Sequence, residues 1–288
     1  MLEKCRWILI VVTFSSLLGA CATPIVRPAG EAMMTSALND DHIITPDGAK
    51  LSLRTWSAND AQPRAILIAL HGFNDYSNFF QDTGSYLADQ GIVTYAYDQR
   101  GFGESPHPGY WAGINTMTGD LEILINLVRT RHPDTPLYLF GESMGGAVVM
   151  VTAQQAREQE RPLDVKGLIL SAPAVWGRIT MPWYQRLALW VSSHTIPGVR
   201  LTGKGLKIVP SDNIEMLLAL GRDPLVIKQT RIDAIYGVTN LMDAALEAAP
   251  GLKESALFLY GEKDEIIPRE PTDLMLSRLP KTSEKTAR

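Results

Sequence analysis

A serine set between glycines is the feature with the clearest chemistry. The segment Gly141-Glu142-Ser143-Met144-Gly145-Gly146 follows an apolar run at 137–140 and precedes a helix-like run at 147–151. Where the pattern G-x-S-x-G joins a strand to a helix, the turn between them is very tight. The residues two before and two after the serine must therefore be small. Such a turn projects the serine hydroxyl above the end of a sheet. We therefore predict that Ser143 is a nucleophile.

A serine nucleophile needs a general base, normally histidine, and an acid that orients the imidazole. In hydrolases built on this turn, the chain order is serine, then aspartate or glutamate, then histidine. Asp264, on a loop after the apolar run 256–260, is the predicted acid. All five histidines precede it, namely His42, His71, His107, His132 and His194. The expected position of the base therefore holds no histidine.

The loop His71-Gly72-Phe73 follows another apolar run, at 65–70. Its glycine lets the backbone turn so that amides face the cleft, and the amides of Phe73 and Met144 are the predicted oxyanion hole. His71 has two interpretations, a general base and a residue that orders this loop. Its place before the serine in the chain favours the second.

The composition excludes some partners. The chain has 288 residues, of which 45% are hydrophobic, so it can bury a sizeable core as one domain or as a domain with an insertion. The net charge is −4 and the pI is about 5.8. Because no basic run interleaves with aromatic residues, nucleic acid is not an expected partner.

The first residues resemble a bacterial lipoprotein signal. Lys4 and Arg6 precede an apolar run at 7–18 that is too short to span a bilayer, and small residues lead to Cys21. We expect residues 1–20 to be a signal peptide, Cys21 to be lipidated and residues 21–40 to be a tether. Ala22 after the cysteine favours the outer membrane, with the protein facing the periplasm. The alternative is an ordinary signal peptide with a chance cysteine.

Strands alternate with helices along the rest of the chain. Residues 42–45 and 51–56 flank Pro46-Asp47-Gly48, which predicts a hairpin. Further strands are expected at 65–70, 92–97, 137–140, 166–170 and 256–260, and helices at 77–90 and 116–131. The alternation predicts an α/β fold with a doubly wound, mostly parallel sheet. The core would comprise 41–172 and 249–288, and residues 173–248, which break the alternation, would form an inserted helical cap.

The expected cap carries a helix-like segment at 183–192 with Trp183, Tyr184 and Trp190. Its apolar spacing has two interpretations. The aromatic side chains either pack the cap onto the core or line a pocket for an acyl chain.

Several motifs together resemble the α/β-hydrolase fold, and within it the monoacylglycerol lipase and lysophospholipase branch. They are His71-Gly72-Phe73, Asp98-x-Arg100-Gly101-x-Gly103-x-Ser105, the Ser143 segment, Arg222-Asp223-Pro224-Leu225 and Gly261-Glu262-Lys263-Asp264-x-Ile266-x-Pro268. The resemblance runs from about residue 41 to 279. It implies a serine esterase that acts on single-chain lipid esters, without a metal or organic cofactor.

The last residues depart from this resemblance. The family continues with a strand, a Gly-His loop that carries the base and a closing helix, whereas residues 281–288 are polar and lack histidine. We therefore expect the last strand and helix to be missing and hydrolysis to be impaired. Two alternatives stay open. One is a non-catalytic lipoprotein that binds a lipid or a partner in the pocket, and the other is an enzyme whose base is His71, His107 or His194.

Overall fold

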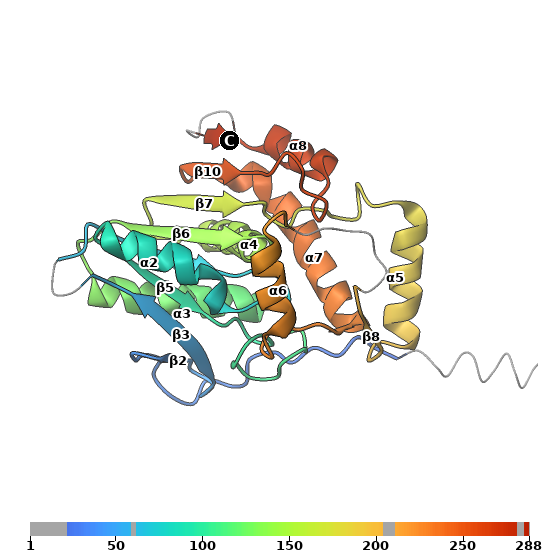
Figure 1. The fold of residues 1–288 in the computed structure, drawn as a ribbon, viewed down its shortest axis with the longest axis horizontal. Coiled ribbons are helices and arrows are strands. Elements are labelled where there is room, and N and C mark those ends of the chain that lie inside the picture. Colours follow the sequence, from blue (N-terminus) through green and yellow to red (C-terminus); the bar gives the residue numbers. More distant parts are fainter. Residues whose placement is uncertain (1–21, 59–61, 204–210, 281–284, 288) are drawn as a thin grey trace, which may run out of the picture.

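The apolar runs form the centre of a parallel sheet. The computed structural model describes residues 22–58, 62–203, 211–280 and 285–287 (Figure 1). The central strands are β4 (Ala65–Leu70), β5 (Ile92–Tyr97), β6 (Leu137–Glu142), β7 (Gly167–Ser171) and β10 (Ala256–Leu259). In β4 and β5 every residue after the first is buried. Continuous apolar runs are what a parallel strand covered on both faces requires.

Among the described residues, the sheet has nine strands in the order β1-β2-β3-β5-β4-β6-β7-β10-β11. The predicted hairpin is confirmed: β2 (His42–Ile44) pairs antiparallel with β3 (Lys50–Trp56), and Gly48 in the turn has a φ of 79°. Strand β3 is antiparallel to β5, and the strands beyond it are parallel. The carboxyl ends of these parallel strands therefore share one edge.

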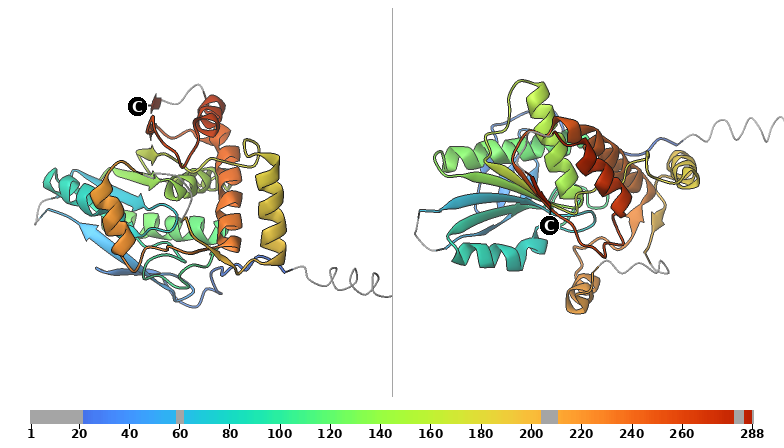
Figure 2. Two further views of the ribbon diagram at one scale, coloured as in Figure 1. Left: turned by 45° about the vertical axis from the view of Figure 1, so that its right-hand side comes forward. Right: turned by 90° about the horizontal axis from the view of Figure 1, so that it is seen from above.

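Helices cover both faces of the sheet, as predicted (Figure 2). A short 3₁₀ turn, η1 (Ser77–Phe80), leads into α2 (Gln81–Asp89) on one face. On the other face lie α3 (Ile114–Arg131), α4 (Met144–Glu158), α7 (Ile232–Ala248), η2 (Ala249–Gly251) and α8 (Arg269–Arg278). In the part of the chain that the structure describes, no helix is both long and apolar enough to cross a bilayer.

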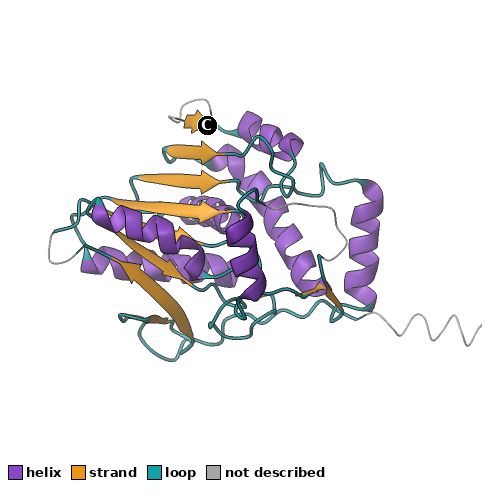
Figure 3. Cartoon of the chain, in the orientation of Figure 1, coloured by secondary structure: helices purple, strands orange, loops and turns teal. Residues whose placement is uncertain are grey.

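The cap is shorter than the sequence predicts. It contains α5 (Trp183–Thr195), β8 (Arg200–Leu201), α6 (Ile214–Arg222) and β9 (Thr230–Arg231), and it lies at one end of the sheet (Figure 3). Helix α7, which we had assigned to the cap, instead packs beside α4. Its side chains Val238, Leu241 and Ala245 are buried in the main core. Their helical spacing gave no indication of which layer they would join.

Two predictions about the ends of the chain differ from the structure. Residues 22–40, expected as a tether, lie against the core, and β1 (Ala37–Leu38) pairs with β2. The last strand is present, because β11 (Lys285–Ala287) pairs in parallel with β10. Backbone pairing does not need apolar side chains, which is why the polar sequence concealed this strand. The neighbouring apolar row of Phe140, Ile169 and Leu257 is only half-buried.

Gly237 provides a test of the packing between α7 and the loop before α3. A Cβ at Gly237 would overlap the indole of the buried Trp111. We expect Gly237→Ala to lower the free energy of unfolding by about 1–3 kcal/mol, because overpacking strains a close-packed core. The measurement is urea denaturation. The control is Gly119→Ala in α3, where a Cβ meets nothing within 4 Å. It should raise stability by up to about 1 kcal/mol, and equal effects of the two substitutions would contradict the packing.

Candidate functional site

The predicted strand–turn–helix is present at Ser143. Ser143 links β6 to α4 with a φ of 47° and a ψ of −113°, in the left-handed region that non-glycine residues rarely enter. A Cβ at Gly141 would lie 2.5 Å from the Gly146 backbone, and one at Gly145 would overlap the Leu70 carbonyl. The glycines are therefore required by contact with β4 and α4. The Ser143 N–H donates to the Ser171 carbonyl at 2.9 Å, which fixes the turn to β7.

The loop after β4 lies against this turn. An ideal Cβ at Gly72 would be 3.4 Å from the Ser143 Cβ and would overlap the Glu142 carboxylate. Met144 opens α4, where the first amides have no acceptor within the helix. Within the described chain, neither the Phe73 nor the Met144 amide donates to a backbone carbonyl. Both are therefore available to a ligand beside Ser143.

His71 orders its own loop. Its Nδ1–H donates to the Gly72 carbonyl at 2.8 Å, and its Nε2 accepts the Gln99 backbone N–H at 3.0 Å. The Gln99 side-chain amide in turn donates to the His71 carbonyl. Burial lowers the pKa of His71 to about 4, so the ring is neutral at pH 7. With both nitrogens engaged, His71 has no lone pair to offer Ser143.

Asp264 lies on the loop after β10, two strands from Ser143 at the same edge of the sheet. Its Oδ1 accepts the N–H groups of Ile266 and Ile267 at 2.8 and 2.9 Å. These bonds hold a half-buried carboxylate whose charge is close enough to act on Glu142, the residue before Ser143. The structure thus gathers the loops that carry Phe73, Ser143 and Asp264 at one edge.

Two carboxyl groups near Ser143 were missed in the sequence. The pKa of Glu142 is raised to about 8, chiefly by burial and also by the charges of Asp75 and Asp264, with a hydrogen bond from the Gly72 backbone acting in the opposite direction. Burial also raises the pKa of Asp75 to about 6, with smaller contributions from Asp223 and Asp98. The sequence did contain one indication of such a group, because Glu142 directly precedes Ser143. A carboxyl group enclosed at that position becomes protonated near neutral pH.

Three of the other four histidines bond to local partners. His42 bonds to Asp41, His132 to Tyr95 and His194 to the Trp190 carbonyl, and His107 is exposed on its loop. Among the described residues, no hydrogen bond joins a histidine ring to Ser143. The same part of the chain has no cluster of three or more His, Cys, Asp or Glu side chains that could hold a metal ion.

The end of the cap is fastened to the loop beside the site. The Tyr76 hydroxyl donates to Asp223 Oδ2 at 2.6 Å, and the Asn74 side chain donates to Thr230 Oγ1 at 2.7 Å. The Ile227 N–H donates to the Asn74 carbonyl at 2.9 Å. The cap aromatics do not pack the cap onto the core, because Trp183 is 73% exposed. Trp183 and Trp190 instead line an open pocket on the cap, and whether it takes an acyl chain stays a prediction.

Asp98 is structural. Its two carboxylate oxygens accept the Ser77 and Glu104 backbone N–H groups, each at 2.9 Å. A Cβ at Gly103 would overlap this carboxylate. The next basic residue, Arg100, is buried in ion pairs with Asp47 and Asp120. This network holds the loop after β5 and leaves Asp98 no free oxygen for catalysis.

This arrangement of the parallel strands, the Ser143 turn and the cap defines an α/β-hydrolase. The family model described as "Serine aminopeptidase, S33" matches residues 61–288. The chain belongs to this family, and it is a monoacylglycerol lipase-like serine hydrolase of carboxylic esters.

Individual relatives are distant but span most of the chain. It is 24% identical to a monoacylglycerol lipase of Mycolicibacterium smegmatis over 86% of this chain and 86% of the relative. It is also 24% identical to the monoglyceride lipase of Homo sapiens, over 85% of this chain and 79% of the relative. The crystal structure of a soluble variant of the Saccharomyces cerevisiae monoglyceride lipase superposes with a TM-score of 0.67 at 21% identity. That superposition covers 93% of this chain and 88% of the yeast chain.

The raised pKa of Glu142 predicts a pH dependence of stability. The folded protein holds a proton on Glu142 that the unfolded chain releases above about 4.5, so stability should fall as pH rises from about 4.5 to about 8. Glu142→Gln should flatten this part of the profile and be the more stable protein at pH 8. Urea midpoints at pH 5, 6.5 and 8 measure it. Glu247→Gln, on the exposed side of α7, is the control and should keep the wild-type profile. A Glu142→Gln profile parallel to wild type would contradict the assignment.

Proposed function

We propose that the protein hydrolyses single-chain lipid esters of the monoacylglycerol type through an acyl-enzyme on Ser143. The observation that carries the proposal is the strained Ser143 turn with two unpaired amides beside it. Relatives described as monoacylglycerol or monoglyceride lipases across most of the chain supply the substrate class. The reaction that such a site supports is acyl transfer, in which the serine oxygen replaces the alcohol oxygen of the ester.

Each group then has a role. The Ser143 oxygen attacks the ester carbonyl, and the amides of Phe73 and Met144 hold the negative oxygen of the tetrahedral intermediate. The glycerol oxygen leaves with a proton, and water then releases the fatty acid from Ser143. Asp264 is the group that would orient and stabilise a protonated imidazole. No cofactor enters these steps.

The serine proton needs an acceptor, and the histidines of this sequence do not provide one. His71 has both ring nitrogens engaged, and within the described chain no other histidine ring bonds to Ser143. We infer that the 288-residue chain turns over slowly, because general-base catalysis typically contributes about 10²–10⁴-fold. The same observation favours a second candidate function. A chain that keeps the pocket without the base would serve as a lipid-binding module.

Labelling with a fluorophosphonate distinguishes these functions. We expect slow covalent labelling of the 288-residue chain that is abolished in Ser143→Ala, because the probe reacts with an activated serine held beside the oxyanion hole. Ser85→Ala, on the exposed side of α2, should label like wild type. Labelling that persists in Ser143→Ala excludes Ser143 as the nucleophile. A wild-type chain that resists labelling while it retains a lipid ester supports the binding module.

We also propose that Cys21 is lipidated and holds the protein at the outer membrane, facing the periplasm. The support lies in the sequence, because the apolar run 7–18 and the small residues before Cys21 fall outside the described residues. A single acyl chain binds membranes only marginally, so stable attachment needs a second lipid chain or a further contact.

Metabolic labelling with an alkyne fatty acid tests the anchor. The wild-type protein should take up the label and sediment with membranes, whereas Cys21→Ser should take up none. Cys5→Ser, which removes the other cysteine, is the control and should be labelled normally. An unlabelled wild-type protein recovered in the soluble fraction would refute the proposal.

A further inference from the structure

The carboxyl group of Glu142 contacts the loop that carries Phe73, close to Ser143. Glu142 is the last residue of β6, and a Cβ at Gly72, on the loop after β4, would overlap its Oε2. The same Cβ position lies 3.4 Å from the Ser143 Cβ. The Glu142 carboxyl therefore occupies the space that a side chain at Gly72 would need, and it explains why a glycine is required there.

Gly72 and Phe73 share a peptide group, so contacts made by Gly72 fix the Phe73 amide. The Gly72 carbonyl accepts the His71 Nδ1–H at 2.8 Å and the Asp75 N–H at 3.3 Å. Because the peptide group is planar and trans, the Phe73 N–H then points the opposite way. The Gly72 backbone also hydrogen-bonds to the Glu142 carboxyl. The orientation of the predicted oxyanion donor therefore depends on Glu142 as well as on the loop itself.

Among the described residues, the charges that act on Glu142 are negative. They belong to Asp75, on the loop after β4, and to Asp264, on the loop after β10. His71, on the same loop as Asp75, is neutral at pH 7 because burial lowers its pKa to about 4. Like charges and burial favour the protonated form of the Glu142 carboxyl. That form keeps a carbonyl oxygen for the Gly72 backbone and adds no negative charge to the site.

The charge state of Glu142 matters because acyl transfer builds a negative oxygen close to it. In the proposed reaction, that oxygen lies at the amides of Phe73 and Met144, on either side of the Ser143 turn. A carboxylate at Glu142 would repel the negative oxygen, and the repulsion is strong where protein excludes water. The coupling is reciprocal, so the negative oxygen also makes Glu142 hold its proton more tightly.

We propose that Glu142 is a positioning residue that works in its protonated form, supporting Gly72 without placing a negative charge beside the predicted oxyanion hole. The proposal rests on the proposed acyl transfer at Ser143 and deepens it, because the site should lose reactivity as Glu142 ionises. This ionisation is expected near pH 8. The alternative role, in which the Glu142 carboxylate accepts the serine proton, requires the opposite dependence on pH.

Fluorophosphonate labelling rates measured between pH 6 and pH 9 test the proposal. Glu142→Gln has the shape of the protonated acid and cannot ionise. We expect the ratio of its labelling rate to that of the wild-type chain to rise at least about fivefold from pH 6 to pH 9, because only the wild-type chain gains the opposing charge. Glu142→Ala, which leaves Gly72 unsupported, should label more slowly than Glu142→Gln at every pH. Glu247→Gln, at an exposed position on α7, is the control, and its ratio to wild type should stay constant. Circular dichroism at each pH shows that the compared proteins are folded.

Asp75→Asn tests the electrostatic origin of the effect. The Asp75 charge raises the pKa of Glu142, so its removal should let Glu142 ionise at a lower pH. Asparagine keeps an oxygen for the Tyr76 N–H, which Asp75 Oδ1 accepts at 2.8 Å. The labelling rate of Asp75→Asn, divided by that of Asp75→Asn/Glu142→Gln, should therefore begin to fall at a lower pH than the corresponding wild-type ratio. An unchanged midpoint contradicts this origin.

Hydrogen exchange of residues 71–76 is a second measurement that does not need the reaction. Exchange should be faster in Glu142→Ala and as slow as wild type in Glu142→Gln, and equal exchange in all three proteins overturns the supporting role. A ratio of Glu142→Gln to wild-type labelling rates that stays constant with pH overturns the role of the proton. So does a ratio that falls as pH rises, since the carboxylate then accepts the serine proton. Failure of the proposed function is distinct, because the wild-type chain would then label no faster than Ser143→Ala at any pH.

Discussion

The close contact between β4, β6 and the start of α4 sets the geometry of the site. Gly141, Gly145 and Gly146 allow these backbones to approach to a distance that no side chain would permit. The contact holds Ser143 at a positive φ, a conformation of high energy that persists only because the surrounding sheet determines it. The unpaired Met144 amide is a consequence of the same turn, since α4 must begin there. The proposed nucleophile Ser143 and half of the predicted oxyanion hole thus depend on one contact.

Electrostatics divides the molecule into two regions. Carboxyl groups from β6 and from the loops after β4 and β10 lie near Ser143, and the charges of Asp75 and Asp264 add to the burial that raises the pKa of Glu142. The segment 165–211, which includes α5, has the opposite character, with six Lys or Arg and no acidic residue. The charges of Asp75 and Asp264 near Ser143 would repel the fatty-acid carboxylate that the proposed ester hydrolysis produces.

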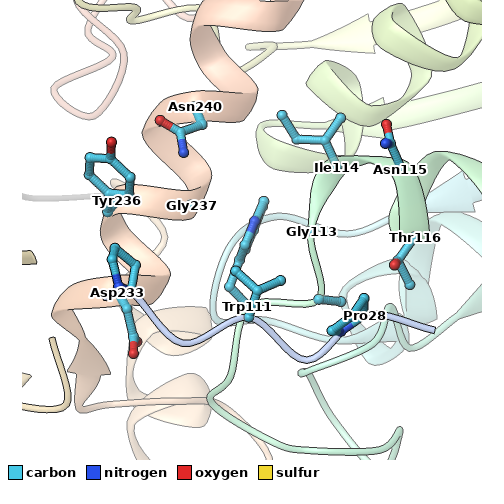
Figure 4. A pocket seen from close by; sticks show the side chains of 13 residues that line it. Pro28, Trp111, Gly113, Ile114, Asn115, Thr116, Asp233, Tyr236, Gly237 and Asn240 are labelled. Atoms are coloured by element: carbon cyan, nitrogen blue, oxygen red, sulfur yellow. The ribbon is translucent and has the colours of Figure 1, made fainter. Parts of the chain in front are cut away.

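The sequence predicted those parts of the structure that local patterns determine. The hairpin around Gly48, the buried strands and the Ser143 turn each follow from a few neighbouring residues. Features that depend on distant contacts were not predictable in this way. Residues 23–30 are held by a backbone bond to Trp111 and by the Asp233 carboxylate (Figure 4), and nothing in the sequence of this segment indicates these contacts. Strand β11 is held by pairing with β10, and α7 joins α4 instead of the cap because of surfaces that form only in the folded state.

The loop beside Ser143 also carries the attachment of the cap. Asn74, one residue after Phe73, has a φ of 68° and bonds to Ile227 and Thr230, and Tyr76 bonds to Asp223. These bonds join the attachment of the cap and the backbone next to the Phe73 amide into one hydrogen-bonded unit. A substitution that removes one of them therefore acts both on the seating of the cap and on the geometry of the predicted oxyanion hole.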